Sequence, residues 1–149
     1  MRKNSFNMRV NWGDTDKAGI VYYPNYFKWF DIAGHQFFRS IGLSPAVLEK
    51  ERGVIIPLID VRCTFVKPLF YDDIITIHTE VSEIHNKVFK LSHEVYCGSD
   101  KTGYGYEVRG WVKNIDGKYK AVPIPEDVIT ILKQDIKSDE SNLNPQLNA

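Results

Sequence analysis

The sequence has no excess of either charge and very little cysteine. Lysine and arginine together number 19, as do aspartate and glutamate, so the formal net charge is zero. This balance argues against nucleic acid and against an anionic membrane as partners. The two cysteines, Cys63 and Cys97, lack the spacing of a zinc site, and the four histidines do not cluster beside them. We therefore expect two reduced, half-buried thiols and no metal site in a cytoplasmic protein.

Long hydrophobic runs and glycine-rich nucleotide motifs are also missing. The first eleven residues alternate between polar and apolar side chains, unlike the apolar core of a signal peptide, and no later run is long enough to span a bilayer. The chain contains no internal repeat, interdomain linker or dinucleotide-binding motif. Its 149 residues suit one domain, which we place at residues 1–137, and the polar segment 138–149 is expected to be disordered.

Aromatic residues are abundant, and many of them lie in one predicted helix. Between Pro24 and Gly42, apolar side chains recur every three or four residues, which is the spacing of one broad helical face. Pro24 suits the first helical position, and Gly42 suits the C-terminal stop. The segment is apolar on nearly all sides, so we expect a sheet to wrap around it. The side chains at helical spacing are Tyr26, Trp29, Phe30, Ala33, Phe37 and Ile41.

The rest of the chain is predicted to be mostly strand. The predicted strands lie at 6–12, 55–66, 75–81, 89–97, 104–114 and 119–122. Short helices are predicted at 44–52 and 125–133, and Asp116-Gly117 predicts a hairpin turn. Short connections favour antiparallel neighbours. We therefore predict an α+β fold in which a curled antiparallel sheet of about five strands wraps one long central helix.

Two carboxylates, Asp14 and Asp16, stand one residue apart in the turn-rich segment before the predicted helix. A calcium loop of the EF-hand type that begins at Asp14 would place Gly19 at its sixth position, as required. However, Ala18 and Asn25 would then occupy the fifth and twelfth positions, where the loop needs an oxygen ligand and a glutamate. The pattern therefore argues against calcium.

Two interpretations of the acidic segment remain open from spacing alone. A solvated acidic turn, in which Asp14 or Asp16 caps local N–H groups, is the more common outcome. The alternative is a site that attacks an acyl group. Such a site needs a carboxylate as general base or nucleophile, close to helix N-terminal N–H groups that hold the developing oxyanion.

The same segment carries a long motif that resembles a known family. The motif reads Asp14-Thr15-Asp16-x-x-Gly19-x-Val21-Tyr22-Tyr23-x-Asn25-Tyr26, followed by Trp29-Phe30-Asp31. It is similar to the signature of hotdog-fold acyl-CoA thioesterases, in particular the 4-hydroxybenzoyl-CoA thioesterase family, and the likeness extends to about residue 122. The resemblance implies a helix wrapped by an antiparallel sheet, edge-to-edge dimers, and tetramers built as dimers of dimers.

The resemblance also implies roles for individual residues. Asp16 matches the family's catalytic carboxylate, which would attack the thioester carbonyl or activate water. The backbone N–H of Tyr23, at the predicted helix start, would hold the thioester oxygen. Gly19 and Val21 would belong to the substrate-binding loop, with Gly19 allowing a tight turn or a close backbone approach. Asp14 would shape this loop without taking part in the chemistry.

Two further residues are candidates for contact with the substrate. By the same resemblance, Asp31 would accept a hydrogen bond from a ring hydroxyl of an aroyl group; otherwise it would lie at the exposed margin of the helix. Lys87, in the turn 83–87, would hold a CoA phosphate, although this turn equally suits a solvated hairpin. His35 and His93 are expected to be structural hydrogen-bonding residues.

We therefore predict a thioester hydrolase that cleaves an acyl-CoA, favours a hydroxybenzoyl-type acyl group and needs no cofactor. Three alternatives stay open. The first is a thioesterase for short-chain aliphatic acyl-CoA or acyl-carrier protein. The second is a hotdog hydratase or dehydratase, whose sites pair an acid with a histidine that the acidic segment lacks. The third is an acyl-CoA-binding protein without catalytic activity.

Overall fold

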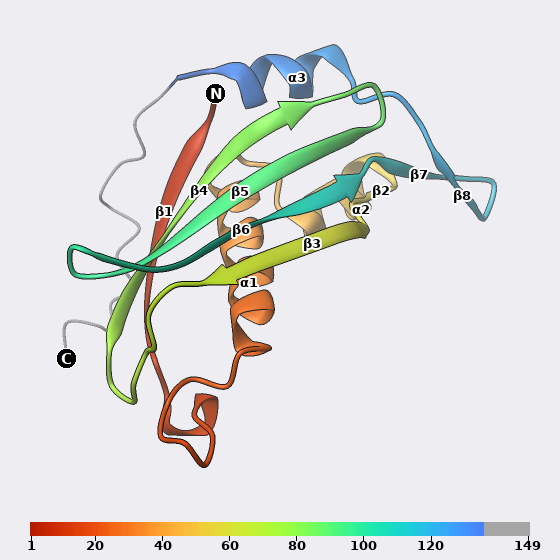
Figure 1. Ribbon diagram of the computed structural model, residues 1–149. Helices are drawn as coiled ribbons and strands as arrows, with labels where there is room; N and C mark the ends of the chain where they lie inside the picture. The colour runs from red at the N-terminus through yellow and green to blue at the C-terminus, as the bar shows by residue number, and fades with distance from the viewer. Residues whose placement is uncertain (136–149) are drawn as a thin grey trace.

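Figure 1 shows the computed structural model, which describes residues 1–135; the predicted disordered segment 138–149 lies outside the described residues. The helices are α1 (Asn25–Ser40), α2 (Pro45–Arg52) and α3 (Glu126–Lys133). The strands are β1 (Lys3–Arg9), β2 (Val54–Ile55), β3 (Leu58–Phe65), β4 (Ile74–Ile84), β5 (Val88–Cys97), β6 (Asp100–Gly110), β7 (Val112–Ile115) and β8 (Lys118–Ala121). None of the three helices described is long and apolar enough to cross a membrane.

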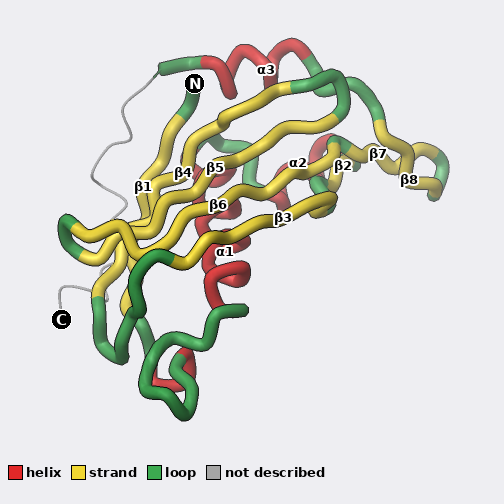
Figure 2. Tube along the Cα trace, viewed as in Figure 1, coloured by secondary structure: helices red, strands yellow, loops and turns green. Residues whose placement is uncertain are grey.

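Five strands form the main sheet in the order β1-β4-β5-β6-β3, and all neighbouring strands are antiparallel. β2, β7 and β8 form a second sheet of three strands. α1 packs against one face of the main sheet, as Figures 1 and 2 show. The predicted α+β fold, with a curled antiparallel sheet of five strands around one central helix, is therefore confirmed.

α1 is stabilised by burial of its aromatic face against the sheet. Its largest fully buried side chains are Trp29, Phe30, Phe37 and Phe38. The predicted stop is confirmed, because Gly42 has a φ of +73° and its N–H donates to the carbonyl of Arg39. The start differs by one residue from the prediction. Pro24 has helical φ and ψ but serves as the N-cap, and the helix begins at Asn25.

A layer of polar side chains divides the core along α1. One apolar cluster surrounds Trp29 and Phe30 in the first half of the helix, and a second surrounds Phe37 and Phe38 in the other half. On β4, buried Thr79 lies between Ile77 of the first cluster and Val81 of the second. Buried His93 lies likewise between Leu91 and Val95 on the neighbouring strand β5. The sheet therefore presents polar groups to the middle of α1.

Two predicted strands are each broken in the structure. The predicted strand 55–66 is divided into β2 and β3 at Pro57, which has no N–H to donate to a ladder. The predicted strand 104–114 is divided into β6 and β7 at Trp111, whose side chain is buried in the core. Both breaks transfer the chain between the two sheets.

Candidate active site

The acidic segment folds as a small hairpin that leads directly into α1. The N–H of Tyr22 donates to the carbonyl of Asp14 at 2.8 Å, and the N–H of Asp16 donates to the carbonyl of Ile20 at 2.9 Å. Gly19 lies in the turn with a φ of +79°, a conformation that glycine adopts without strain. The tight turn expected at Gly19 is present.

The two carboxylates of this hairpin have different surroundings. Oδ2 of Asp14 accepts a hydrogen bond of 2.8 Å from the N–H of Asn11 and so caps the single 3-10 turn Trp12–Asp14. Oδ1 of Asp16 accepts a hydrogen bond of 2.8 Å from the N–H of Ala18, and the Asp16 side chain is exposed. Within residues 1–135, nothing donates to Oδ2 of Asp16. Asp14 therefore holds the loop, whereas Asp16 is oriented through one oxygen and presents the other.

The backbone N–H of Tyr23 is an open donor at the start of α1. The N–H groups of Asn25 and Tyr26 donate to the carbonyls of Tyr22 and Tyr23, but the Tyr23 N–H has no acceptor in the described part of the chain. The helix N-terminus adds a partial positive charge at this point. The exposed Tyr23 ring packs edge-on against Phe65 of β3, with ring centroids 6.1 Å apart. The hairpin therefore brings an oriented carboxylate and a free donor into one short segment.

Val21 is buried, whereas Gly19, the other residue predicted for the substrate-binding loop, is exposed. The Val21 side chain belongs to the apolar cluster around Trp29, and its N–H donates to the carbonyl of Leu69 at 2.8 Å. In this chain Val21 anchors the hairpin to the core and presents little side-chain surface to a substrate. Alternation within the short hairpin explains the burial of Val21, because neighbouring Tyr22 points outward and is exposed.

Asp31 lies two turns into α1 and is held by an arginine of β6. Its side chain is 53% exposed, yet its Oδ1 accepts a hydrogen bond of 2.9 Å from Nη2 of Arg109, which is only 8% exposed. Nδ1 of His35 lies 2.8 Å from the backbone carbonyl of Asp31. Asp31 is thus neither buried without a partner nor free at the helix margin. It combines an exposed oxygen with a fixed one.

Neither Arg109 nor its neighbour Glu107 is among the candidates chosen from the sequence. Charged residues in a strand usually face solvent, which hides such pairs from sequence analysis. Their positions within the predicted strand could have indicated that Glu107 and Arg109 face the helix. Glu107 and Arg109 follow Gly103 and Gly105 at alternate positions of β6, and aromatic rings of α1 pack over both glycines. That face of the strand therefore points at the helix.

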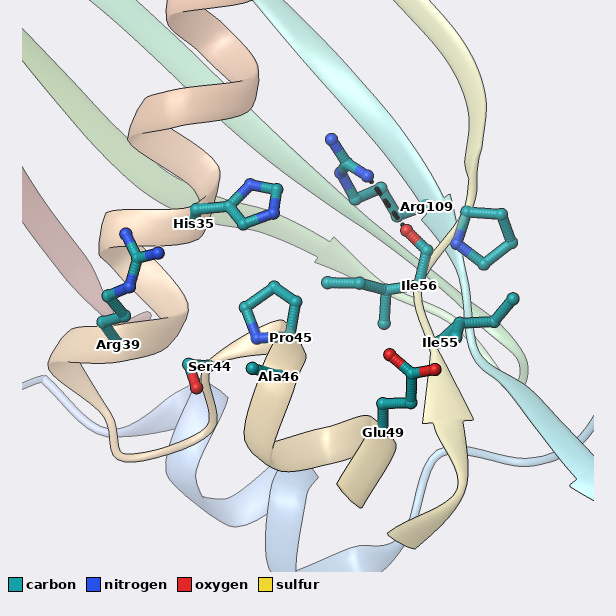
Figure 3. A pocket seen from close by; sticks show the side chains of 10 residues that line it. His35, Arg39, Ser44, Pro45, Ala46, Glu49, Ile55, Ile56 and Arg109 are labelled. Carbon is teal, nitrogen blue, oxygen red and sulfur yellow. Dashed lines mark hydrogen bonds between the residues drawn. The ribbon is translucent and has the colours of Figure 1, made fainter. Parts of the chain in front are cut away.

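A pocket of about 450 Å³ lies beside Arg109, on the side away from the acidic hairpin. Figure 3 shows it between the second half of α1, the start of α2 and the link from β2 to β3. Its walls include His35, Ile56 and Arg109, and the volume suits a small organic group. Asp16 and Tyr23 do not line this pocket. One chain therefore presents the catalytic candidates and this pocket at different points along α1.

Lys87 is not brought near Asp16 within one chain. The start of β4 is joined to the acidic segment, because the N–H of Val10 donates to the carbonyl of Asp73. Lys87 follows the other end of this strand, and 11 residues at about 3.3 Å each span about 35 Å. Figure 1 shows the β4–β5 turn and the hairpin at opposite ends of the sheet. Contact between Lys87 and a ligand at Asp16 would need a second subunit.

The remaining histidine and cysteine candidates have structural surroundings. His93 is fully buried and forms hydrogen bonds with Thr79 and Glu107, as expected for a structural residue. Both cysteines are free and half-buried, and burial raises the pKa of the Cys63 thiol to about 11. This thiol is protonated at neutral pH and is a weak nucleophile. Residues 1–135 contain no cluster of three His, Cys, Asp or Glu side chains suited to a metal ion.

A family model described as the thioesterase-like superfamily matches residues 10–132, which include the acidic hairpin, α1 and Arg109. The chain belongs to this superfamily. The resemblance drawn from the motif is thereby confirmed, and the protein is a thioester hydrolase. The matched region includes the acidic hairpin, where a carboxylate and a backbone N–H donor lie at the start of a helix.

Relatives and solved structures agree with this membership. The 4-hydroxybenzoyl-CoA thioesterase of Pseudomonas sp. strain CBS-3 is 33% identical over 140 residues, which is 87% of this chain and 97% of that protein. A variant of a 4-hydroxybenzoyl-CoA thioesterase, solved with 4-hydroxybenzoyl-CoA, matches with a TM-score of 0.80 and 32% identity over 89% of this chain and 100% of that one. A gentisyl-coenzyme A thioesterase matches with a TM-score of 0.77 and 34% identity over 88% and 100%. These likenesses confirm the hotdog fold.

Proposed function

We propose that the protein hydrolyses a hydroxylated aromatic acyl-CoA to the free acid and CoA, with Asp16 as the reacting carboxylate. The observation that carries this proposal is the hairpin itself. It orients Asp16 through one oxygen, leaves the other oxygen free, and ends at the open N–H of Tyr23. The named relatives act on acyl-CoA thioesters, which supports this substrate class.

The proposed chemistry uses only these groups and water. The Tyr23 N–H donates to the thioester oxygen and stabilises the negative charge that develops on it. Asp16 then acts in one of two ways. As a nucleophile it forms a bond to the carbonyl carbon while the C–S bond breaks, and water cleaves the resulting anhydride. As a general base it removes a proton from water, which attacks the same carbon and expels the CoA thiolate.

The hydroxyl preference in the proposal comes from Asp31. Asp31 lies six residues after Asn25, the first residue of α1, which is about 9 Å along the helix at a rise of about 1.5 Å per residue, and Tyr23 lies two residues before that start. A single para-hydroxylated benzene ring with a hydrogen bond at each end covers about the same distance. The names of the relatives above also carry hydroxylated aromatic acyl groups.

We further propose that the working unit is an oligomer joined at β3. This strand forms one edge of the main sheet and carries exposed apolar side chains, a combination typical of an interface. These side chains are Leu58, Ile59 and Phe65. The Tyr23 ring packs on Phe65, so a partner at this edge would border the proposed site. A second subunit is also what Lys87 would need to reach a CoA phosphate.

A panel of CoA esters with detection of the released thiol tests the proposal. We expect the wild type to cleave 4-hydroxybenzoyl-CoA with a kcat/KM about tenfold or more above that for benzoyl-CoA, because the hydroxyl donates to a charged acceptor. Asp31→Ala should abolish this preference. An equal preference in wild type and Asp31→Ala would remove Asp31 from the proposed role.

The same panel separates the alternatives left open by the sequence. Thiol release from aliphatic esters alone would favour the short-chain thioesterase. Addition of water to an enoyl-CoA without thiol release would favour a hydratase. Tight binding of CoA esters with no thiol released from any of them would favour a binding protein.

A further inference from the structure

A charged network lies beneath the exposed carboxylate of Asp31. Nη2 of Arg109 donates to Oδ1 of Asp31 at 2.9 Å and to Oε1 of Glu107 at 3.0 Å. Nη1 of the same guanidinium donates to the carbonyl of Ile56 at 2.9 Å, the hydrogen bond drawn in Figure 3. Three acceptors on three segments of the chain therefore hold one guanidinium in place.

Glu107 anchors this guanidinium to the middle of the core. It is 1% exposed, and its Oε2 lies 3.2 Å from Nε2 of His93. His93 is held in turn by Thr79 at 2.8 Å and is stacked on the ring of Phe30, with centroids 4.7 Å apart. Buried charges persist only where partners satisfy them, and here each has a partner. The network is consequently fixed at its inner end.

The helix leaves room for this carboxylate at a glycine. A Cβ atom at Gly34 would lie 3.0 Å from Oε2 of Glu107, closer than side-chain carbons normally approach. Glycine in the middle of a helix costs about 1 kcal/mol relative to alanine. Its presence at this point is explained by the space that the Glu107 carboxylate occupies under α1.

Asp31 is the solvent-exposed end of this network. Oδ1 of Asp31 is occupied by Arg109, and within residues 1–135 no group donates to Oδ2 of Asp31. We propose that Arg109 is a positioning residue for substrate selection: it fixes the Asp31 carboxylate so that Oδ2 faces the acyl group and accepts the ring hydroxyl. This inference rests on the proposed function and deepens it.

The arrangement explains why a half-exposed carboxylate can discriminate between substrates. A free aspartate on a helix surface samples several rotamers, and each hydrogen bond that it forms must offset the loss of that freedom. Arg109 is itself immobilised by Glu107 and Ile56, so it removes this freedom before the substrate binds. A purely structural Arg109 would only join α1, β6 and the segment before β3.

The two roles predict different results for Arg109→Lys. Lysine keeps the charge but cannot reach three acceptors at once, because it lacks the planar fork of the guanidinium. If Arg109 positions Asp31, the ratio of kcat/KM for 4-hydroxybenzoyl-CoA to that for benzoyl-CoA should fall about tenfold or more, towards the ratio in Asp31→Asn. The double variant should show the same ratio as Asp31→Asn alone. If Arg109 is only structural, both esters should lose similar factors and the ratio should stay at the wild-type value.

Controls keep the test decisive. Arg52→Lys changes the same residue type in an ion pair with Asp127 away from the site, and it should leave the ratio unchanged. Glu107→Gln removes one anchor of Arg109 without touching Asp31 and serves if Arg109→Lys does not fold; it should lower the ratio as well. A wild-type ratio that persists in whichever variant folds overturns the proposal for Arg109 and leaves the thioesterase standing. A wild type that releases no CoA from either ester contradicts the proposed function and this inference with it.

Discussion

Three aspartates of this protein, Asp14, Asp16 and Asp31, differ in the groups that hold their carboxylates. Asp14 and Asp16 are one residue apart, yet the first caps a turn through Asn11 and the second keeps one oxygen free. Asp31 is a third case, because a largely buried arginine holds one of its oxygens while the side chain stays half-exposed. The direction in which each carboxylate is held, more than its presence in a motif, decides what it can do.

The buried carboxylate of Glu107 predicts how stability depends on pH. Burial alone would raise the pKa of Glu107, but the hydrogen bond with His93 and the charges of His93 and Arg109 outweigh it and leave this pKa lowered. A carboxyl with a lowered folded pKa contributes stability above its unfolded pKa of about 4.3, and this contribution is lost as pH falls through the folded value. We therefore expect the Tm to fall below about pH 4.3, and to fall less steeply in Glu107→Gln.

Thermal denaturation between pH 6 and pH 3 measures this dependence. Glu83→Gln is the matched control, because Glu83 is an exposed glutamate whose pKa is also lowered by a hydrogen bond to a histidine, His85. Exposed pairs contribute little to stability, so this variant should follow the wild type. Identical curves for Glu107→Gln and wild type would show that the network does not titrate as described.

At the scale of secondary-structure elements, the sequence predicts the helix caps and turns, because these depend on residues that are close together in the chain. Ser44 and Pro45 define the start of α2, and the Ser44 hydroxyl accepts the predicted capping hydrogen bond from Val47. The turn at Asp116-Gly117 forms with both φ values positive, as a two-residue hairpin turn requires. The strand breaks at Pro57 and Trp111 are harder to predict than these caps and turns. They depend on which strand each segment pairs with, and those partners are distant in the sequence.

The same limit applies to the candidate site. The motif identifies Asp16, Tyr23 and Asp31 because they lie close together in sequence. Arg109 contacts only Asp31 among these three, from a strand 78 residues further along the chain, so its contribution depends on the register of the sheet. Lys87 is the reverse case. Its position in the sequence suggests a contact with CoA, but it follows the end of β4 that is remote from Asp16.

The contact between β3, β6 and α1 predicts one strongly destabilising substitution. Gly105 on β6 has no space for a side chain, because a Cβ atom there would overlap the backbone carbonyl of Arg62 on β3 and crowd the ring of Phe30. Backbone cannot move aside as a flexible side chain can. We expect Gly105→Ala to lower the free energy of unfolding by about 3 kcal/mol or more.

Urea denaturation measures this loss. Gly13→Ala is the matched control for stability, since nothing lies within 4 Å of a Cβ atom there and its φ is not positive. This variant should remain within about 0.5 kcal/mol of the wild type. Equal unfolding midpoints for the two variants would contradict the close packing of β6 against β3.

At the scale of the whole molecule, the main sheet ends on an edge that a monomer would leave exposed. β3 pairs only with β6 among the described strands, and Ile59 is 60% exposed. Proteins usually protect such an edge with charge or a partner. Pairing of two β3 edges would join the sheets of two subunits and cover the apolar side chains next to the acidic hairpin.

Substitution of Ile59 tests this assembly. Ile59→Lys places a charge on the edge and should shift the protein from dimer or tetramer towards monomer in light scattering after size exclusion. Ile115→Lys is the matched control, because Ile115 is 42% exposed but lies in the β7–β8 hairpin away from this edge. A wild type that is monomeric at micromolar concentration, or an oligomer unchanged by Ile59→Lys, would contradict assembly through β3.

In the proposed thioesterase site, Asp16 is the reacting carboxylate and Asp14 supports the loop that carries it. The most direct measurement is the rate of thiol release from 4-hydroxybenzoyl-CoA by Asp16→Asn and Asp14→Asn side by side. An asparagine at position 14 keeps an oxygen for the N–H of Asn11, whereas one at position 16 can neither attack nor take a proton. We expect Asp16→Asn to fold normally and lose turnover by about 10²- to 10⁴-fold, and Asp14→Asn to retain most of it. Turnover retained in Asp16→Asn, or lost equally in both variants, would contradict these roles for Asp16 and Asp14.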